Sequence, residues 1–535
     1  MTEPWIKYYT KEQLDIEIPN INLYDQIVNS KEKYPNNIAI EYLGKKITFK
    51  ELVQFIDRAA QGLYNLGIRE NDVVTFSLPN VPEVLICFYA VNKIGGICNM
   101  THPLISSSEL NESIDKTNSK LVITILDNYE KINSKNKIVI VNPTEFIGVD
   151  NNMYPDSENI VLFKTLLAST GSIENKKSDY NKIAAILPSG GTSGKSKHVL
   201  ISNKTFLSHS LHQNIMLRNV KVGESYLAIS PNFHGFGLST SMHAPLSLGC
   251  KTILVPKFDF TKFDELLVQT KPTVILGVPT LFEALIKSKN SDLDLSFVKY
   301  IISGGDNLSS SLENKINKYL KDHNCNTNIV QGYGLTEALT SVSCCHDEIF
   351  KRGSIGIPVS DNHIQIMNKN NEIVPYGELG EICISGDVVM NGYLNDEEET
   401  NKVLKYHDER TWLHTGDLGY MDEDGFIYYK GRIKRMYISS GYNVYPQYVE
   451  DIIKQFKNVE DCCVVDVPHE YKKHVGIAYI ILENKIDLED LKTYCSNNLA
   501  HYMIPQEFIV VDKFPKTKLG KINYKELQKI HRLEV

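Results

Sequence analysis

Short apolar runs rich in valine, isoleucine and leucine alternate with segments of helical periodicity along much of the chain. The runs have the composition of buried strands, and the clearest lie at residues 72–78, 121–125, 183–187, 252–255, 273–276 and 300–302. Residues 48–66 differ, because a threonine suited to cap a helix precedes apolar residues that fall on one helical face. This alternation predicts an α/β fold, with parallel or mixed sheets covered by helices.

Two later stretches depart from this pattern. Residues 142–182 are polar and lack periodicity, which predicts a long surface excursion. After about residue 350 the strands shorten and Asp-Gly turns appear, as at residues 422–425, which predicts a smaller β subdomain.

The C-terminal part of the chain has its own short pattern. Helical spacing appears at residues 449–456 and 488–499, and apolar strands are expected at 462–467 and 478–482. This pattern predicts a small α+β domain. We therefore divide the chain into a large N-terminal domain (1–431), a hinge (432–435) and a small C-terminal domain (436–535).

Composition narrows the class of protein. A chain of 535 residues, 42% hydrophobic and 23% charged, is expected to form a soluble protein of two or more domains. Its net charge of -8 argues against nucleic-acid binding. No apolar stretch is long enough to span a membrane, the N-terminus lacks a secretory core, and the ten cysteines show no zinc or disulfide spacing. We expect a cytoplasmic protein.

A phosphate-binding loop is expected behind the strand at 183–187. The sequence Ser-Gly-Gly-Thr-Ser-Gly-Lys-Ser-Lys occupies residues 189–197. Its small residues let backbone N–H groups approach phosphate oxygens, and its hydroxyls and lysines add donors and positive charge. The loop nearly matches the P-loop pattern, with Ser189 in place of the first glycine. The alternative is a flexible linker.

A second motif, Gln-Gly-Tyr-Gly-Leu-Thr-Glu, occupies residues 331–337. An aromatic ring such as Tyr333 can stack on adenine, a hydroxyl such as that of Thr336 can donate to a phosphate, and a carboxylate such as Glu337 can hold Mg²⁺. The alternative is a helix start capped by Thr336. That alternative leaves the run Gly332-Tyr333-Gly334 unexplained.

Two further fragments carry polar groups suited to a nucleotide. Asp417, in His-Thr-Gly-Asp, can accept hydrogen bonds from both ribose hydroxyls, and Arg432 can donate to the same sugar. Lys521, near the C-terminus, can stabilise the charge on a carboxylate that attacks a phosphate. The alternatives are an ordinary turn aspartate and a solvated tail lysine.

Taken in order, these fragments resemble the adenylate-forming superfamily, which includes acyl- and aryl-CoA synthetases, firefly luciferase and peptide-synthetase adenylation domains. The resemblance runs from Ile47 to Lys521 and is closest to the acyl- or aryl-CoA ligase branch. The chain departs from the family's phosphate loop, which usually has proline at the position of Ser196 and glycine at that of His198. Tyr448 stands where a glutamate is usual.

The resemblance implies a role for each matched residue. Nucleotide binding is implied for Ser189, Gly190, Gly191, Thr192, Ser193, Gly194, Lys195, Lys197, Gly305, Asp306, Gln331, Gly332, Tyr333, Thr336, Asp417 and Arg432. Lys521, Thr336 and His234 are implied to be catalytic, and Glu337 to bind the metal. Lys434 is implied to be the hinge of a mobile small domain, and Gly441 to lie in a thiol tunnel.

His234 bears on the substrate. Relatives that activate amino acids commonly have an aspartate directly after the aromatic residue that matches Phe233, and here that position is His234. An imidazole cannot hold an ammonium group in a buried pocket. The segments that the resemblance places near the acid are small and apolar: residues 238–242, 277–280 and 338–339. We therefore expect a hydrophobic carboxylic acid.

The expected activity is an ATP-dependent acid–thiol ligase of fatty or aryl acid metabolism. It would use ATP, Mg²⁺ and coenzyme A, forming an acyl-adenylate and then a thioester. Three alternatives remain: an enzyme that loads an acyl carrier protein, a non-catalytic nucleotide-binding relative, and a P-loop kinase or ATPase. The missing first glycine disfavours the last of these.

Overall fold

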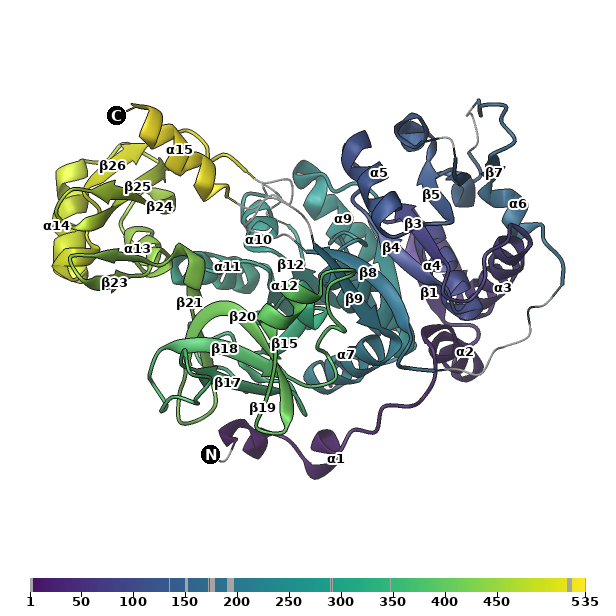
Figure 1. Ribbon diagram of the computed structural model, residues 1–535, viewed down its shortest axis with the longest axis horizontal. Coiled ribbons are helices and arrows are strands. Elements are labelled where there is room, and N and C mark those ends of the chain that lie inside the picture. The colour runs from purple at the N-terminus through teal and green to yellow at the C-terminus, as the bar shows by residue number, and fades with distance from the viewer. Residues whose placement is uncertain are drawn as a thin grey trace.

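Four β-sheets organise the chain, and they follow one another roughly in sequence order (Figure 1). The computed structural model describes residues 3–133, 135–149, 153–171, 173, 179–189, 197–288, 290, 292–346, 348–516 and 522–534. Two sheets with their helices form the body of the molecule, a third borders it, and the fourth lies at the C-terminal end beside α15 (Tyr524–Glu534).

A seven-stranded sheet carries the first strands of the α/β pattern. Its order is β7 (Ile160–Leu162), β6 (Lys137–Val141), β5 (Leu121–Ile125), β3 (Val73–Ser77), β4 (Ile97–Met100), β8 (Ile183–Ser189) and β9 (Lys197–Ser202). All neighbours are parallel except β8 and β9, which pair in antiparallel fashion. The predicted strands at 121–125 and 183–187 are confirmed. The stretch 142–182 differs from the expected excursion, because β7 pairs with β6 within it.

A nine-stranded sheet forms the second half of the body. Its order is β16 (Ile357–Pro358), β15 (Ser341–Cys344), β14 (Ile329–Gly334), β13 (Tyr300–Ser303), β12 (Val274–Gly277), β10 (Ser225–Ala228), β11 (Lys251–Leu254), β1 (Ile38–Tyr42) and β2 (Lys45–Thr48). The strands from β14 to β1 are parallel. At the two edges the pairs β1–β2, β14–β15 and β15–β16 are antiparallel. The sheet is thus mixed, as the pattern predicts.

Helices of the expected kind connect and cover these strands. They are α1 (Lys11–Leu14), α2 (Leu23–Lys33), α3 (Phe49–Asn65), α4 (Pro82–Ile94), α5 (Ser107–Lys116), α6 (Phe163–Leu167), α7 (Asn203–Met216), α8 (Ala244–Ser247), α9 (Phe263–Thr270), α10 (Pro279–Ile286) and α11 (Ser310–Asp322). Thr48 caps α3 through a reciprocal bond with Glu51, which confirms the predicted helix start. A π-helical segment, η4, spans Phe236–His243.

Helix α4 joins the two halves of the body. Every residue of α4 is buried, including the polar Glu83, Asn92 and Lys93 among its mostly apolar residues. It packs against α2 and α3, and its polar side chains reach the other half. The Asn92 side-chain amide donates a hydrogen bond to Oδ1 of Asn203 in α7 at 2.8 Å. The Tyr89 hydroxyl lies 3.0 Å from Nδ1 of His243 in η4.

The third sheet is the predicted β subdomain. It contains β17 (His363–Met367), β18 (Gly380–Ser385), β20 (Arg410–Met421), β19 (Leu404–His407) and β21 (Ile427–Arg432), all paired in antiparallel fashion. Helix α12 (Glu397–Val403) precedes β19. The Asp-Gly turn at 422–425 connects β20 to β21, as expected.

The fourth sheet forms the small C-terminal α+β unit. Its strands are β23 (Tyr442–Val444), β22 (Tyr437–Ser439), β25 (Lys473–Leu482), β24 (Val459–His469) and β26 (Glu507–Val510). Its helices are α13 (Pro446–Ile453), α14 (Leu488–Asn498) and α15. Helix α13 starts three residues before the predicted position, because Pro446 can occupy the first turn of a helix.

The ten cysteines and the helix lengths complete the description. All ten cysteines are buried and form no disulfide. Within the described part of the chain, no helix has both the length and the apolar character needed to cross a bilayer.

Glu83, at the start of α4, generates a prediction about stability. Both of its carboxylate oxygens are buried with no hydrogen-bond partner among the described residues. Burial raises the pKa of Glu83 from 4.5 to about 8. The unfolded chain therefore loses this proton at a lower pH than the folded protein, and stability falls as the pH rises between these two values.

We expect Glu83→Gln to remove this pH dependence, because the amide is never charged. The gain in free energy of unfolding should be a few kcal/mol larger at pH 8 than at pH 5, since one pKa unit corresponds to about 1.4 kcal/mol. Denaturant unfolding at the two pH values measures this difference. The exposed Glu130→Gln is the control and should show no such difference. An equal effect of Glu83→Gln at both pH values would contradict the prediction.

Candidate functional site

The candidate site lies where the parallel strands β13 and β14 end side by side. Ser303, the last residue of β13, pairs with Gln331 of β14, so the loop after β13 starts beside the C-terminal half of β14. The Gln331 carboxamide accepts a hydrogen bond from the backbone of Leu308 at 3.2 Å, which ties this loop to β14. Gly305 and Asp306 are exposed on the loop, and Gly332 lies in β14 directly after Gln331.

Asp417 links this edge of the sheet to the β subdomain. Its carboxylate accepts a hydrogen bond from the Tyr333 hydroxyl at 2.7 Å and forms an ion pair with Nε of Arg432 at 2.9 Å. Arg432 also donates to the backbone carbonyl of Thr415 at 3.1 Å. The Asp417 side chain is only 2% exposed, whereas that of Arg432 is 40% exposed. Three predicted residues from β14, β20 and β21 therefore meet at one buried carboxylate.

The charges of this cluster support one another. Burial, followed by the negative charge of Asp417, raises the pKa of Tyr333 well above its usual range, so its hydroxyl remains a donor. Burial disfavours the charge on Arg432, but the attraction of Asp417, together with that of Tyr429, Tyr333 and Glu337, outweighs it and the pKa of Arg432 is raised. The ring of Tyr429 lies 6.2 Å from that of Tyr333 and adds an aromatic surface that the motifs did not predict.

The turn after β14 does not start a long helix. Thr336–Ala338 form a single 3-10 turn, η6, whose N-cap is Leu335 and not Thr336. The alternative interpretation of Thr336 as a helix cap is therefore wrong, and the Thr336 side chain serves no capping bond in η6.

Close backbone packing explains two glycines around this turn. A Cβ atom on Gly334 would lie 1.5 Å from the carbonyl oxygen of Thr340, and one on Gly235 would lie 1.5 Å from that of Leu339. Only glycine fits at such positions. The second contact brings the loop that carries His234 against the end of η6.

Glu337 connects η6 to the flank of the predicted phosphate loop. Its Oε1 accepts a hydrogen bond from the Tyr393 hydroxyl at 3.0 Å. The ammonium group of Lys197 lies 4.4 Å from the centre of the Tyr393 ring and bonds to Glu399 at 2.5 Å. The hydrogen bond from Lys197, together with a second one from Lys402, lowers the pKa of Glu399 to about 2. Tyr393 thus lies between two predicted residues.

The two ends of the phosphate loop are described, and its middle is not. Ser189 ends β8 and pairs with Lys197, which begins β9, and β8 contacts η6. Gly190, Gly191, Thr192, Ser193, Gly194, Lys195 and Ser196 lie outside the described residues. His198 is half-buried, with Nε2 at 3.2 Å from the Ser113 hydroxyl.

The surroundings of His234 are aromatic and neutral. The neighbouring Phe233 ring lies 4.5 Å from the ring of His102. Burial, followed by Lys131, lowers the pKa of His102, so this imidazole is neutral near pH 7. No aspartate or glutamate occurs in the sequence between Glu224 and Asp259. This segment therefore supplies no carboxylate for a bound ammonium group.

The remaining predicted residues lie away from this cluster. Lys434 is exposed in the 3-10 turn Ile433–Arg435 and lines a cavity of about 250 Å³ beside Tyr524 and Gln528. Gly441 is exposed at the tip of the β22–β23 hairpin, where Ser440 and Gly441 both have positive φ, as a two-residue turn requires. Lys521 lies outside the described residues.

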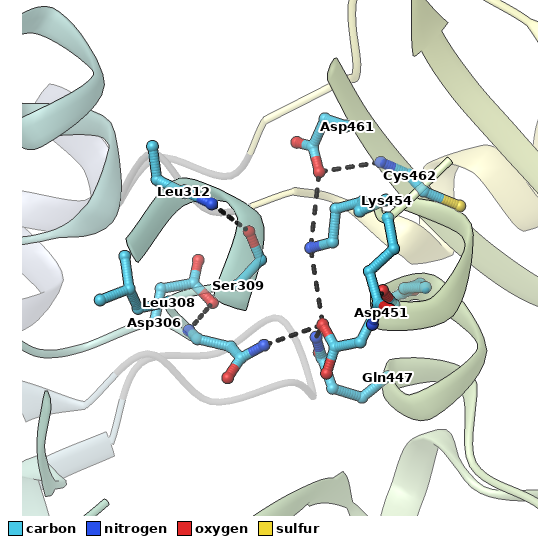
Figure 2. A network of polar contacts seen from close by, with 12 residues as sticks. Asp306, Leu308, Ser309, Leu312, Gln447, Asp451, Lys454, Asp461 and Cys462 are labelled. Atoms are coloured by element: carbon cyan, nitrogen blue, oxygen red, sulfur yellow. Dashed lines mark hydrogen bonds and ion pairs between the residues drawn. The ribbon is translucent and has the colours of Figure 1, made fainter. Parts of the chain in front are cut away.

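A polar network joins the small unit to the loop after β13 (Figure 2). Asn307, next to Asp306, donates to Asp451 of α13 at 3.0 Å. Lys454 lies between Asp451 and Asp461 at 3.9 and 3.8 Å. Burial disfavours the charge on Lys454, but the two aspartates outweigh it and its pKa is raised. Two more exposed ion pairs, Lys287–Glu460 and Lys315–Glu483, flank this network.

Three contributors to this site were not predicted from the motifs. Tyr393 and Tyr429 follow no spacing rule, and only the fold brings them near Glu337 and Tyr333. Glu450 of α13 bonds to Arg435 at 2.5 Å, and no motif in the sequence indicated this contact.

Comparison with known proteins identifies two matching families. The AMP-binding enzyme profile matches residues 27–394, and the AMP-binding enzyme C-terminal domain profile matches residues 448–521. A long-chain-fatty-acid–CoA ligase from Bacillus subtilis (strain 168) is 30% identical over 97% of this chain and 96% of its own length. The 4-coumarate–CoA ligase 3 of Arabidopsis thaliana is 29% identical over 98% and 94%.

Solved structures share the fold. A crystal structure of the anthranilate CoA ligase AuaEII in complex with anthranoyl-AMP has a TM-score of 0.86 at 21% identity and covers 98% of this chain and 99% of its own. ATP-bound MatB from Rhodopseudomonas palustris has a TM-score of 0.84 at 23% identity, over 96% and 99% of the two chains. The α/β architecture with a small C-terminal domain, expected from the sequence, is confirmed.

The Asp417 cluster generates a prediction about stability. Asp417→Ala removes the shared acceptor of Tyr333 and Arg432 and should lower the free energy of unfolding by about 2 kcal/mol, because the Tyr333 hydroxyl loses its partner and Arg432 loses its ion pair. Thermal and denaturant unfolding measure this loss. Asp424→Asn, at an exposed ion pair beside the same hairpin, is the control and should change the midpoints little. Equal effects of the two substitutions would contradict the structural role of Asp417.

Proposed function

The chain belongs to the AMP-binding, adenylate-forming enzyme family, in its acyl- and aryl-CoA ligase branch, and from this premise we propose that it joins a hydrophobic carboxylic acid to coenzyme A at the expense of ATP. The observation that carries the proposal is the buried Asp417 carboxylate between Tyr333 and Arg432, beside the Thr336–Glu337 turn. An anionic acceptor, an aromatic pair and a cation at one strand end suit a ribose and an adenine ring.

In the first step, a carboxylate oxygen of the acid attacks the α-phosphorus of ATP. The bond from this phosphorus to the bridging oxygen of the β-phosphate breaks, and acyl-AMP and pyrophosphate form. Asp417 and Arg432 hold the ribose, and Thr336 donates to the α-phosphate. Lys195, Lys197 and the backbone of the phosphate loop bind the remaining phosphates, while Lys521 stabilises the charge between carboxylate and phosphate.

Glu337 is the residue that would hold Mg²⁺. Only its Oε1 has a described hydrogen bond, from Tyr393, and the residue is partly exposed. A carboxylate with an available oxygen is a ligand that Mg²⁺ accepts, so the residues present fit the ion. The ion would supply charge neutralisation for the phosphates.

The acid is proposed to be a hydrophobic monocarboxylic acid. The proposal is supported by the absence of acidic residues between Glu224 and Asp259 and by the aromatic contact of Phe233 beside His234. The ring of Phe236 adds apolar surface beside Gly304. A Cβ atom placed on Gly304 would lie 3.6 Å from this ring. An α-amino acid would bury its ammonium group without a counter-charge in this segment.

In the second step, the thiol sulfur of coenzyme A attacks the carbonyl carbon of acyl-AMP. The bond to the AMP oxygen breaks, AMP leaves, and the thiol proton passes to solvent. We propose that the small domain, residues 436–535, turns about Lys434 between the two steps, withdraws Lys521 and presents the Gly441 hairpin to the thiol. The exposed positions of Lys434 and Gly441 support this assignment.

A substrate screen tests the proposed function. We expect pyrophosphate release with fatty or aryl acids and none with free α-amino acids, because the segment around His234, between Glu224 and Asp259, supplies no carboxylate for an ammonium group. Thioester formation is then measured with coenzyme A and, separately, with a phosphopantetheinylated carrier protein. Fast adenylation of an amino acid with fatty and aryl acids inert would overturn the substrate class. Thioester formation with the carrier protein alone would show that coenzyme A is not the acceptor.

A substitution at Lys521 separates the two steps. Lys521→Ala should slow acyl-AMP formation by about 10²–10³-fold, the scale for the loss of one preorganised donor. The same protein, supplied with synthetic acyl-AMP, should form thioester at a near-normal rate. Lys513→Ala, an exposed lysine of the same segment, is the control and should leave both rates unchanged. If Lys521→Ala slows both steps equally in folded protein, the two-conformation mechanism is wrong.

A further inference from the structure

A cluster of three metal-ligand side chains lies in the β subdomain, outside the proposed nucleotide contacts. Glu381, Cys383 and His414 each offer one donor atom, and these atoms lie within 4.8 Å of one another. Cys383 of β18 is paired directly with His414 of β20, and Glu381 lies two residues before Cys383 on the same face of the strand. Because the ligands come from two strands, no cysteine spacing in the sequence revealed them.

The distances within the cluster are those of a metal-binding group. Nδ1 of His414 lies 3.5 Å from Sγ of Cys383 and 2.8 Å from Oε2 of Glu381. Ligands at about 2.3 Å (sulfur) and about 2.0 Å (nitrogen) around a tetrahedral Zn²⁺ are about 3.5 Å apart, so the sulfur and nitrogen already have this separation. Glu381 would move outward by a fraction of an ångström, which its partly exposed side chain permits.

A second observation points to a further ligand. Nε2 of His407 and Nε2 of His414 are both buried and have no hydrogen-bond partner among the described residues. The His407 ring lies 6.1 Å from the His414 ring and is stacked on Trp412 at 5.8 Å. Leaving a buried ring nitrogen without a partner is costly, and a bound cation satisfies such a nitrogen at His407.

We propose that Glu381, Cys383 and His414 form a binding site for Zn²⁺ or a similar transition-metal cation, and that His407, whose ring lies 6.1 Å from that of His414, completes it after its side chain turns toward the cluster. On binding, the Cys383 thiol releases its proton to solvent, and His414 carries its remaining proton on Nε2 so that Nδ1 can bind the metal. The mixed sulfur, nitrogen and oxygen ligands favour such a cation over Mg²⁺ and Ca²⁺, which prefer oxygen alone. The site is distinct from Glu337, the proposed magnesium ligand.

The metal site and the Asp417 cluster share a short piece of backbone. Oε1 of Glu381 accepts a hydrogen bond from the backbone of Gly416 at 2.8 Å, next to Asp417. His414 and Asp417 lie on the same strand, β20. A cation on Glu381 and His414 therefore binds against the turn that orients Asp417.

Cobalt binding to the full-length protein tests the proposal. The protein is stripped with a chelator, dialysed and titrated with Co²⁺. We expect one equivalent to bind, with the strong visible absorption of a tetrahedral site and a near-ultraviolet thiolate band, and Zn²⁺ to displace it. Mg²⁺ should not compete. Absence of stoichiometric binding, or displacement by Mg²⁺, would overturn the site.

Matched substitutions locate the ligands. Cys383→Ser should abolish the thiolate band and weaken Co²⁺ binding at least about ten-fold, whereas Cys325→Ser, at a buried cysteine outside the cluster, should change neither. His407→Asn should weaken binding but keep the thiolate band. Should Cys383→Ser not fold, as judged by circular dichroism, Glu381→Gln provides the same test of affinity. An unchanged spectrum and affinity in the folded cluster variants would show that the three side chains only position β20, and the proposal would fail.

Discussion

The buried carboxylate of Asp417 is the constraint on which the site depends. A carboxylate that is almost fully removed from water must be paired, and its two partners come from different elements, Tyr333 of β14 and Arg432 of β21. Meeting this requirement fixes the β subdomain against the edge of the nine-stranded sheet. The aromatic surface, the acidic acceptor and the guanidinium are thereby held in one arrangement before any ligand arrives, which lowers the cost of binding.

Around this cluster, backbone packing brings distant segments to one turn. The glycines at 235 and 334 allow contacts at which any side chain would collide with a carbonyl oxygen, so the His234 loop and η6 approach directly. The rigid strands supply the positions, and the loops after them supply the chemistry. The same principle holds at β8 and β9, whose paired ends Ser189 and Lys197 fix both sides of the phosphate loop.

The contact between the large and small units has a different physical character. Across it, Asn307 donates to Asp451 (Figure 2), and the exposed ion pairs Lys287–Glu460 and Lys315–Glu483 connect the two units. Exposed pairs contribute little each and weaken with salt, so an interface of this kind is held more loosely than an apolar core. Such a contact suits the movement of the small domain that we propose.

The sequence by itself determined the class of fold, the order of the sheets' strands along the chain and the residues of most motifs. These features depend on local patterns: β-branched runs, a capping threonine, glycine-rich turns, and short motifs whose order identifies a family. Only the tertiary structure decided which of these residues meet. Tyr393 reaches Glu337, Glu450 pairs with Arg435, and Cys383 faces His414 because strand pairing and chain crossing bring them together. No local pattern encodes such contacts, since each depends on register between segments far apart in the chain.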